Sequence, residues 1–207
     1  MKNKSLFIVF EGIDGSGKTT QLNMALKYLR SRGVPCVGLR EPTDGPHGTE
    51  IRDILRGEVT AGPEEQLNLF MLDRADDYEK NICPALEKGQ TIVMDRYLHS
   101  NAAYQGALGI DPVRIISENR NKGFPYPDRV YFIDLPPEIA VKRISGRNPD
   151  GAVELFEKKA FLQKVRDIYL EIADETFLII DGSAPPEEIH RIVISDLELI
   201  TCATGVV

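Results

Sequence analysis

The chain has 207 residues, which fits one α/β domain whose core is large enough to need neither disulfides nor a structural metal. Its formal net charge of −7 argues against non-specific binding to nucleic acid, and its apolar runs are too short for a membrane-spanning helix. Cys36, Cys83 and Cys202 show neither metal-ligand spacing nor an obvious pairing, so we expect inert thiols.

The first predicted element is a strand over residues 6–10, an unbroken apolar run typical of a strand buried on both faces. It begins too close to the N-terminus to leave room for a signal peptide, so we expect a cytoplasmic protein. It ends at a full match to the pattern Gly-x-x-x-x-Gly-Lys-Thr over residues 12–19, and a helix is expected over residues 18–31. Strand, loop and helix therefore stand in the order that a phosphate-binding loop requires.

Each residue type in this loop has a chemical role. Glycines allow tight bends and present backbone N–H groups to an anion, at which the N-terminus of the helix also points. Lys18 would reach the β- and γ-phosphates, and Thr19 would offer a hydroxyl to Mg²⁺. We therefore expect the loop to bind a nucleoside triphosphate with Mg²⁺ through Gly12, Ile13, Asp14, Gly15, Ser16, Gly17, Lys18, Thr19 and Thr20.

Strands and helices alternate along the rest of the chain. Further buried strands are predicted over residues 34–39, 91–94, 129–135 and 177–180. Helices are predicted over residues 50–56, 63–86 (which Pro84 can interrupt), 100–106, 111–119, 136–145, 156–173 and 186–199, with a frayed tail from Thr201. This alternation predicts one α/β domain over residues 1–207, with five parallel strands, helices on both faces of the sheet, and ligands at the carboxyl ends of the strands.

Charged side chains gather at those carboxyl ends. Asp14 follows the first strand, Arg40 follows the second, and Asp95 and Arg96 follow the third. A carboxylate at the end of a buried strand can hold Mg²⁺, and Asp95 fits this role, although a cap at the start of the next helix is the alternative. Arg96 would then stand beside the phosphates, unless it makes only a surface salt bridge.

Five motifs, in consistent order from residue 5 to residue 195, resemble the thymidylate kinase family. They are Phe-Glu-Gly-Ile-Asp-Gly-Ser-Gly-Lys-Thr-Thr-Gln at residues 10–21, Arg-Glu-Pro at 40–42, Phe-x-x-x-Arg at 70–74, the block from Asp95 to Gly106, and Arg-Ile-x-x-Arg at 143–147. The fourth is the most specific, since many NTPases with a phosphate-binding loop lack it. The resemblance implies a P-loop NTPase fold, transfer of the γ-phosphate of ATP to dTMP with Mg²⁺, and a homodimer packed through helices in the first half of the chain.

The resemblance also assigns residues to the two phosphate-bearing substrates. Asp14 would hold the 3′-hydroxyl of dTMP, and Arg40 and Arg96 would hold its phosphate. Arg143 would lie by the adenine of ATP. The physical chemistry agrees, because two anionic substrates repel each other and guanidinium groups offset that repulsion.

Five further positions would surround the base and sugar of dTMP. Phe70 would stack on the pyrimidine, Arg74 would hydrogen-bond its carbonyl edge, and Tyr104 would crowd the 2′ position. Ser100 and Gln105 would line the same pocket. The alternatives are that Phe70 and Tyr104 are packed core residues and that Arg74 is a solvated charge on its helix.

The segment over residues 147–157 resembles the family's lid, but two positions depart from the family pattern. One branch of the family carries an arginine inside the P-loop where this chain has Gly15, and members with a basic lid often carry one where this chain has Leu155. Positive charge on the transferring group must then come from elsewhere. Arg147 is the best candidate, ahead of Arg143 and Lys142, and completes a catalytic set of Lys18, Arg96, Asp14 and Arg147.

Asp76 and Asp77 also depart from the family, which commonly has Gln-His or a similar pair after the base-contacting arginine. Both could face solvent, or one could accept a hydrogen bond from a cytosine amino group, so a kinase of dUMP, UMP or CMP is the alternative. A nucleotide switch and a binding module without catalysis are two further classes. The chain has no Asn-Lys-x-Asp motif, which argues against a guanine-specific switch.

Overall fold

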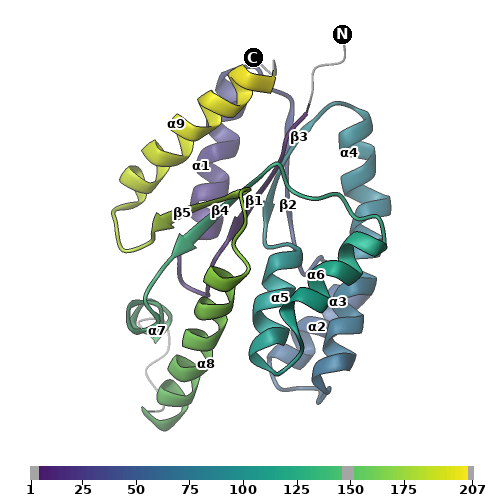
Figure 1. The fold of residues 1–207 in the computed structure, drawn as a ribbon, viewed down its shortest axis with the longest axis vertical. Coiled ribbons are helices and arrows are strands. Elements are labelled where there is room, and N and C mark those ends of the chain that lie inside the picture. The colour runs from purple at the N-terminus through teal and green to yellow at the C-terminus, as the bar shows by residue number, and fades with distance from the viewer. Residues whose placement is uncertain (1–4, 146–151, 205–207) are drawn as a thin grey trace.

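A computed structural model of the chain describes residues 5–145 and 152–204, with side chains over 5–144 and 158–201. Its centre is a wholly parallel sheet of five strands in the order β2-β3-β1-β4-β5 (Figure 1). The strands are β1 (Phe7–Glu11), β2 (Cys36–Arg40), β3 (Thr91–Asp95), β4 (Arg129–Asp134) and β5 (Phe177–Asp181). The predicted five-stranded parallel sheet is therefore confirmed.

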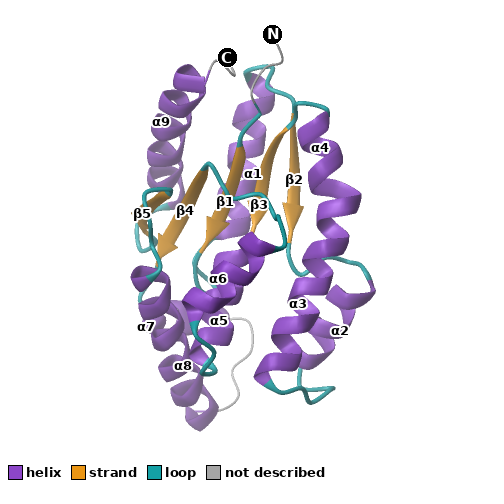
Figure 2. Cartoon of the chain, turned by 45° about the vertical axis from the view of Figure 1, so that its right-hand side comes forward, coloured by secondary structure: helices purple, strands orange, loops and turns teal. Residues whose placement is uncertain are grey.

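β1 lies in the middle of the sheet because its side chains are apolar on both faces. Residues 7–10 are at most 2 % exposed, and Val9 is in register with Met94 of β3 on one side and Val130 of β4 on the other. Ile8 packs with α1 (Lys18–Ser31) and α9 (Pro186–Thr204), whereas Val9 packs with the helices of the opposite layer. Figure 2 shows the sheet between these layers.

The other helices lie on the opposite face and below the carboxyl ends of the strands (Figures 1 and 2). They are α2 (Pro46–Leu55), α3 (Pro63–Asp77), α4 (Cys83–Glu87), α5 (Leu98–Ala107), α6 (Pro112–Asn121), α7 (Pro137–Ser145) and α8 (Ala152–Glu171). α2 packs on α3, α5 packs on both α6 and α8, and α7 packs on α8. The helices therefore surround the end of the sheet where the candidate site lies.

The predicted helix over residues 63–86 is divided. α3 ends at Asp77, a π-helical turn η1 (Tyr78–Ile82) follows, and α4 begins at Cys83. Pro84 accounts for the division because it has no N–H to donate to the preceding turn. The predicted interruption is therefore confirmed, and it lies just before the proline.

Three predicted helix ends are wrong. α8 begins at Ala152 instead of residue 156. α2 begins at Pro46 instead of residue 50, since proline is favoured in a first turn. α9 continues to Thr204, so the tail is not frayed at Thr201, which is 5 % exposed and donates from Oγ1 to the backbone oxygen of Leu197 at 2.7 Å. Cys36 and Cys83 carry free, half-buried thiols. Within the described ranges, none of the helices has both the length and the apolar character of a membrane span.

Candidate active site

The predicted phosphate-binding loop leaves β1 and opens α1. Gly12, Gly15 and Gly17 have φ angles of 145°, 83° and 104°, a range that glycine adopts without strain. At Gly12 there is also no room for a side chain, because a Cβ would lie 2.7 Å from the backbone oxygen of Ile133 in β4. The loop therefore keeps the tight bend that anion binding at the N-terminus of α1 requires.

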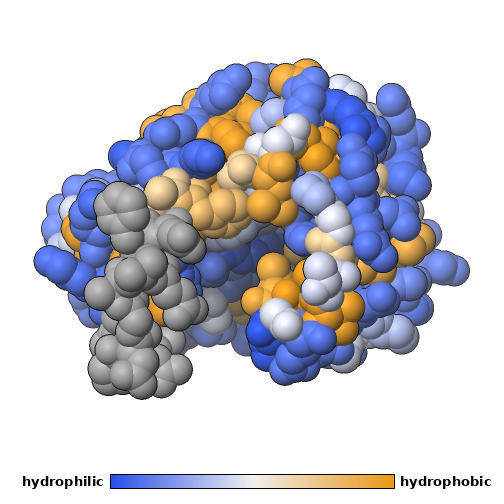
Figure 3. All heavy atoms as spheres, turned by 90° about the horizontal axis from the view of Figure 1, so that it is seen from below, coloured by the Kyte–Doolittle hydropathy of each residue, from blue (hydrophilic) through white to orange (hydrophobic). Residues whose placement is uncertain are grey.

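The loop borders a cavity of about 780 Å³ at the carboxyl ends of the strands. Seen from that end, the molecule has a hollow with a hydrophilic floor (Figure 3). The structure brings together here six of the residues singled out from the sequence, Asp14, Lys18, Thr19, Asp95, Arg96 and Arg143. Lys158 of α8, which was not predicted, lines the same cavity.

Lys18 is the buried cation of this cavity. Its side chain donates from Nζ to a backbone oxygen of the loop at 3.1 Å, and the residue is 6 % exposed. Burial and, to a smaller degree, the charge of Arg96 lower the pKa of Lys18 to about 8, although Asp95, Asp14 and Glu11 oppose this. The amine is therefore mostly charged at neutral pH, and a phosphate beside it would form a charge-assisted hydrogen bond.

Thr19 and Asp95 meet at the mouth of the loop. Thr19 Oγ1 donates to Asp95 Oδ2 at 2.5 Å. A hydroxyl and a carboxylate are hard oxygen donors, which Mg²⁺ prefers when phosphates and water supply its other ligands. The two residues therefore fit Mg²⁺ that is bound together with a nucleotide. Over the described part of the chain there is no group of three or more His, Cys, Asp or Glu side chains that would hold a metal on its own.

Arg96 and Asp14 form an ion pair across the cavity. Arg96 Nη2 lies 2.6 Å from Asp14 Oδ1, and the Asp14 side chain is 56 % exposed. Arg96 also donates from Nη1 to Ser100 Oγ at 3.1 Å and from Nη2 to Tyr104 Oη at 3.3 Å. Burial alone would raise the pKa of Asp14, but the charges of Arg96 and Lys18 outweigh it and hold that pKa below its usual value.

The backbone of Arg96 is strained. Its φ angle is 68°, and it is the only residue other than glycine with a positive φ in the part of the chain that the structure describes. Such a conformation costs about 1–3 kcal/mol and persists only where the surroundings impose it. The strained turn directs the guanidinium toward Asp14 and the cavity.

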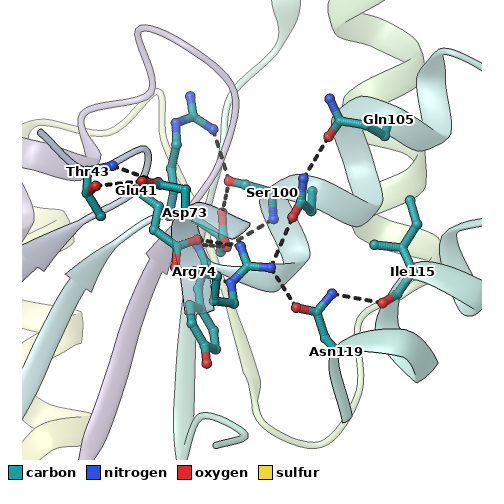
Figure 4. A network of polar contacts seen from close by, with 12 residues as sticks. Glu41, Thr43, Asp73, Arg74, Ser100, Gln105, Ile115 and Asn119 are labelled. Atoms are coloured by element: carbon teal, nitrogen blue, oxygen red, sulfur yellow. Dashed lines mark hydrogen bonds and ion pairs between the residues drawn. The ribbon is translucent and has the colours of Figure 1, made fainter. Parts of the chain in front are cut away.

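Arg74 lies in a different environment from the one predicted. Its Nε and Nη2 atoms donate to the two oxygens of Glu41, its Nη1 donates to Asn101 at 3.0 Å and to Asn119 at 2.6 Å, and its side chain is 1 % exposed (Figure 4). Burial raises the pKa of Glu41, although the charge of Arg74 opposes this. Arg74 is therefore neither a solvated charge nor a group that borders a described cavity.

Phe70 and Gln105 also differ from the expected pocket lining. Phe70 is half-buried and packs beside Ile51 and Leu55 of α2, in a crevice too narrow for a water molecule. Gln105 is 2 % exposed, and its Oε1 accepts a hydrogen bond from Asn101 Nδ2 at 2.9 Å. Gln105 thus supports Asn101 from behind, and its predicted place beside the base is not what the structure shows.

A second cavity, of about 700 Å³, lies on the β2 side of the first cavity. It is bordered by Arg40, Asp76 and Asp77. Arg40 pairs with Asp44 at 2.6 Å and is 62 % exposed, so it does not converge with Arg96. Asp76 pairs with Lys80 at 2.8 Å. Asp77 is 2 % exposed, and burial raises its pKa, so the expectation that both aspartates face solvent is wrong for Asp77.

Comparison with known proteins identifies the family. The thymidylate kinase family model matches residues 10–193. The chain belongs to the thymidylate kinase family. It is 41 % identical over 186 residues to a thymidylate kinase of Leptospira borgpetersenii, covering 90 % of each chain, and 39 % identical over 194 residues to that of Fervidobacterium nodosum, covering 91 % of this chain and 96 % of the relative. A probable thymidylate kinase of Archaeoglobus fulgidus is 44 % identical over 186 residues, with 90 % and 91 % covered. The predicted resemblance is confirmed, and the chain is an ATP-dependent phosphotransferase.

Arg143 of the kinase joins the P-loop to the loop after β5. It donates from Nη1 to the backbone oxygen of Gly15 and from Nη2 to that of Gly182, both at 3.2 Å. A cavity of about 240 Å³ lies beside it, bordered by Gly17, Thr20, Gln21, Gly182 and Ala184. The residues after β5 were not predicted; their signal was the turn Asp181-Gly182-Ser183 at the carboxyl end of a strand.

The lid of the kinase is only partly described. Arg147 lies outside the described residues, as do the side chains of Leu155 and of the rest of the predicted lid up to residue 157. Lys158 follows directly. It borders the cavity of about 780 Å³ beside the P-loop, which we call the phosphate cavity. Its neighbour Lys159 instead pairs with Glu138 of α7 at 2.7 Å.

Sequence reasoning missed the buried polar network around Arg74 and Asp73. Glu41, Asn101 and Asn119 bind Arg74, and Asp73 accepts from the backbone N and Oγ1 of Thr43 at 2.8 and 2.5 Å. Glu41 stood in a recognised motif without a role of its own. Asn101 and Asn119 could have been found as amide side chains on helix faces that pack inward.

Proposed function

We propose that the kinase transfers the γ-phosphoryl group of ATP to dTMP, giving ADP and dTDP. The observation that carries the proposal is one cavity bordered both by the P-loop, with Lys18, and by the Arg96–Asp14 pair. Two anionic substrates need two such sets of groups, held so that their phosphates meet in line. The names of the relatives support dTMP as the acceptor.

On the ATP side, residues 12–20 would surround the triphosphate and Lys18 would bind its β- and γ-phosphates. Thr19 and Asp95 would hold Mg²⁺, which supplies positive charge to the phosphates when it is bound. The cavity beside Arg143 has the size and position for the adenine and its sugar. The kinase itself contributes fixed N–H groups and charges and no covalent step.

On the acceptor side, Arg96 would exchange part of its bonding with Asp14 for the phosphate of dTMP. The half-exposed Asp14 carboxylate would then be free to accept from the 3′-hydroxyl, and Tyr104, over whose ring the Arg96 guanidinium lies at 5.0 Å, would crowd the 2′ position. Arg40 would reach the same phosphate only after leaving Asp44. Phe70 keeps its proposed place against the base, and Arg74 would reach it only through a change in the buried network.

Two cations are the best candidates to offset the negative charge of the transferring phosphoryl group. Arg147 keeps its predicted role, and Lys158 joins it because it borders the phosphate cavity from α8. Lys158→Ala should lower kcat by roughly tenfold or more, since removal of transition-state charge is expensive. Lys159→Ala is the matched control, because Lys159 pairs with Glu138 away from the cavity. Equal kcat values for the two variants would exclude Lys158 and leave Arg147 as the best candidate, ahead of Arg143 and Lys142.

An acceptor panel tests the proposed function. Initial rates with dTMP, dUMP, dCMP and CMP, each with ATP and Mg²⁺, should be dominated by dTMP. Dominance by a cytosine nucleotide would revive the proposed role of Asp76 or Asp77 in base choice. ATP hydrolysis that does not depend on any acceptor would point to a nucleotide switch.

The proposed homodimer is supported by apolar side chains on α2 and α3, where Leu55 is 62 % and Leu72 is 39 % exposed. Singly exposed leucines are common on protein surfaces, so the homodimer depends on the following test. Sedimentation of the purified kinase, compared with Leu72→Glu, tests it: the variant should sediment as a monomer. The expected cytoplasmic location remains a prediction.

A further inference from the structure

Glu11, the last residue of β1, is a fully buried carboxylate that none of the roles above uses. Its Oε1 accepts from the backbone N–H groups of Tyr97 at 2.9 Å and Ser100 at 3.1 Å. Its Oε2 accepts from Ser100 Oγ at 2.6 Å and from Tyr169 Oη at 2.9 Å. One side chain thus joins the central strand, the first turn of α5 and the last turn of α8.

These contacts fall at the point where α5 lacks a cap of its own. The N-cap residue is Tyr97, and its side chain makes no capping hydrogen bond. The first turn of a helix leaves N–H groups without partners inside the helix, and a buried one costs about 1–3 kcal/mol if it stays unpaired. Glu11 supplies an acceptor from the neighbouring strand, which the Ser100 N–H shares with the backbone oxygen of Tyr97 at 3.0 Å, and its negative charge suits a helix N-terminus.

The same contacts hold the strained turn at Arg96. The backbone N of Arg96 donates to the oxygen of Phe10 at 3.0 Å, and the next N–H, of Tyr97, donates to Glu11. Two successive amides are thereby tied to two successive residues of β1. An arginine with a positive φ angle persists only where its surroundings impose that conformation. These two hydrogen bonds impose it on Arg96.

Burial disfavours the charged form of Glu11, whereas the groups that contact it favour that form. Burial raises the pKa of Glu11, while the hydrogen bonds from Ser100 and Tyr169 and the charge of Arg96 lower it. All four groups that contact its oxygens are donors to a carboxylate. Charge-assisted hydrogen bonds of this kind are the stronger class, so the turn is held firmly.

We infer that Glu11 is a positioning residue, which fixes the first turn of α5 on β1 so that Arg96 is aimed at the acceptor phosphate, and which links that turn to α8. The inference rests on the proposed function, because it takes the position of Arg96 to serve the binding of the acceptor, dTMP. It predicts that weakening the Glu11 contacts harms the acceptor side of the reaction and leaves the ATP side intact.

Glu11→Gln is the first variant. Glutamine keeps one oxygen for the two N–H groups and can direct its NH₂ at the two hydroxyls, so the fold is retained while the charge is lost. We expect kcat to fall about 10- to 100-fold, as for a small misplacement of reacting groups, with a raised KM and calorimetric Kd for dTMP and an unchanged KM for ATP.

Tyr169→Phe and Tyr131→Phe form a matched pair that does not depend on Glu11→Gln folding. Both tyrosines are fully buried, and each donates to a carboxylate, Tyr169 to Glu11 at 2.9 Å and Tyr131 to Asp196 at 2.8 Å. Tyr131 and Asp196 lie between β4 and α9, away from the acceptor residues. We expect Tyr169→Phe to raise the KM for dTMP and Tyr131→Phe to leave it unchanged.

The inference is overturned if Glu11→Gln folds with a lower Tm but unchanged kcat and KM values, or if the two Tyr→Phe variants have the same KM for dTMP. Both results would make Glu11 a purely structural group. Failure of the proposed function looks different, because the unaltered kinase would then not phosphorylate dTMP at all.

Discussion

The kinase contains two arginine–carboxylate pairs of opposite character, Arg74–Glu41 and Arg96–Asp14. Arg74 and Glu41 are 1 % and 3 % exposed, and acceptors from α5 and α6 bind the rest of the Arg74 guanidinium. Arg96 and Asp14 are 16 % and 56 % exposed and open into the phosphate cavity. The first pair joins parts of the fold to each other, whereas the second leaves charge available to a ligand.

The difference shows what burial does to one kind of interaction. A closed pair has already lost its water, so removing one partner leaves an uncompensated buried charge. An open pair keeps part of its hydration, so removing one partner costs the fold little, but the cavity loses a group that phosphate can bind. Removing one partner of the closed pair, Arg74–Glu41, should therefore lower stability. Removing one partner of the open pair, Arg96–Asp14, should lower activity.

Arg96→Ala should have the largest effect of any single change. We expect kcat to fall by roughly 10³-fold or more, as for loss of a catalytic arginine, while the free energy of unfolding changes little. Steady-state kinetics and urea unfolding on one preparation measure both quantities. Near-normal turnover would show that the open pair is not part of the acceptor site.

Arg74→Ala should act on stability first. Breaking a buried pair costs about 3–5 kcal/mol, which urea unfolding would show as a lower midpoint. The double variant Arg74→Met with Glu41→Leu sharpens the comparison, because it leaves no charge unpaired and should recover much of the loss. A stable Arg74→Ala variant would mean that the pair is not closed in solution.

The sequence predicted the open pair better than the closed one, for a physical reason. Asp14 and Arg96 stand directly after buried strands, and the carboxyl ends of parallel strands meet at one edge, so periodicity alone places them together. Arg74 sits within a helix, and its partners come from three other elements. Only the packing of α3 against α5 and α6 shows that its side chain points inward.

The same limit applies elsewhere. Strand positions and the P-loop followed from apolar runs and glycine spacing, which act locally. The acceptor at Glu11 depends on how distant elements pack, and no local pattern encodes it. Lys158 was not predicted because the predicted lid ended at residue 157, one position before it.

Asp14→Asn tests the open pair from its other side. The amide loses the charge that faces Arg96 and can still accept from a sugar hydroxyl, so the effect should be smaller than that of Arg96→Ala. We expect the KM for dTMP to rise by about tenfold, equal to about 1.4 kcal/mol, with the KM for ATP unchanged. A change confined to the KM for ATP would place Asp14 on the wrong substrate.

The smallest expected effect, for each unit of pH, is the loss of stability in acid that a buried, uncharged histidine causes. His99 is 0 % exposed, and burial lowers its pKa to about 3, so between pH 6.5 and 3 the unfolded chain binds a proton that the folded chain does not. Stability should therefore fall by about 1.4 kcal/mol per pH unit below pH 6.5 from this residue alone. Urea unfolding of His99→Gln should show a flatter dependence, and an identical slope would contradict burial of the neutral ring.

The central place of β1 in the sheet also bears on how the chain is made. β1 leaves the ribosome first, yet its neighbours β3 and β4 begin at Thr91 and Arg129. The phosphate-binding loop is thus synthesised long before the strands that hold it in shape, and parallel pairings across such distances form slowly. A nascent chain stalled before Arg129 should bind no nucleotide, however complete its glycine motif.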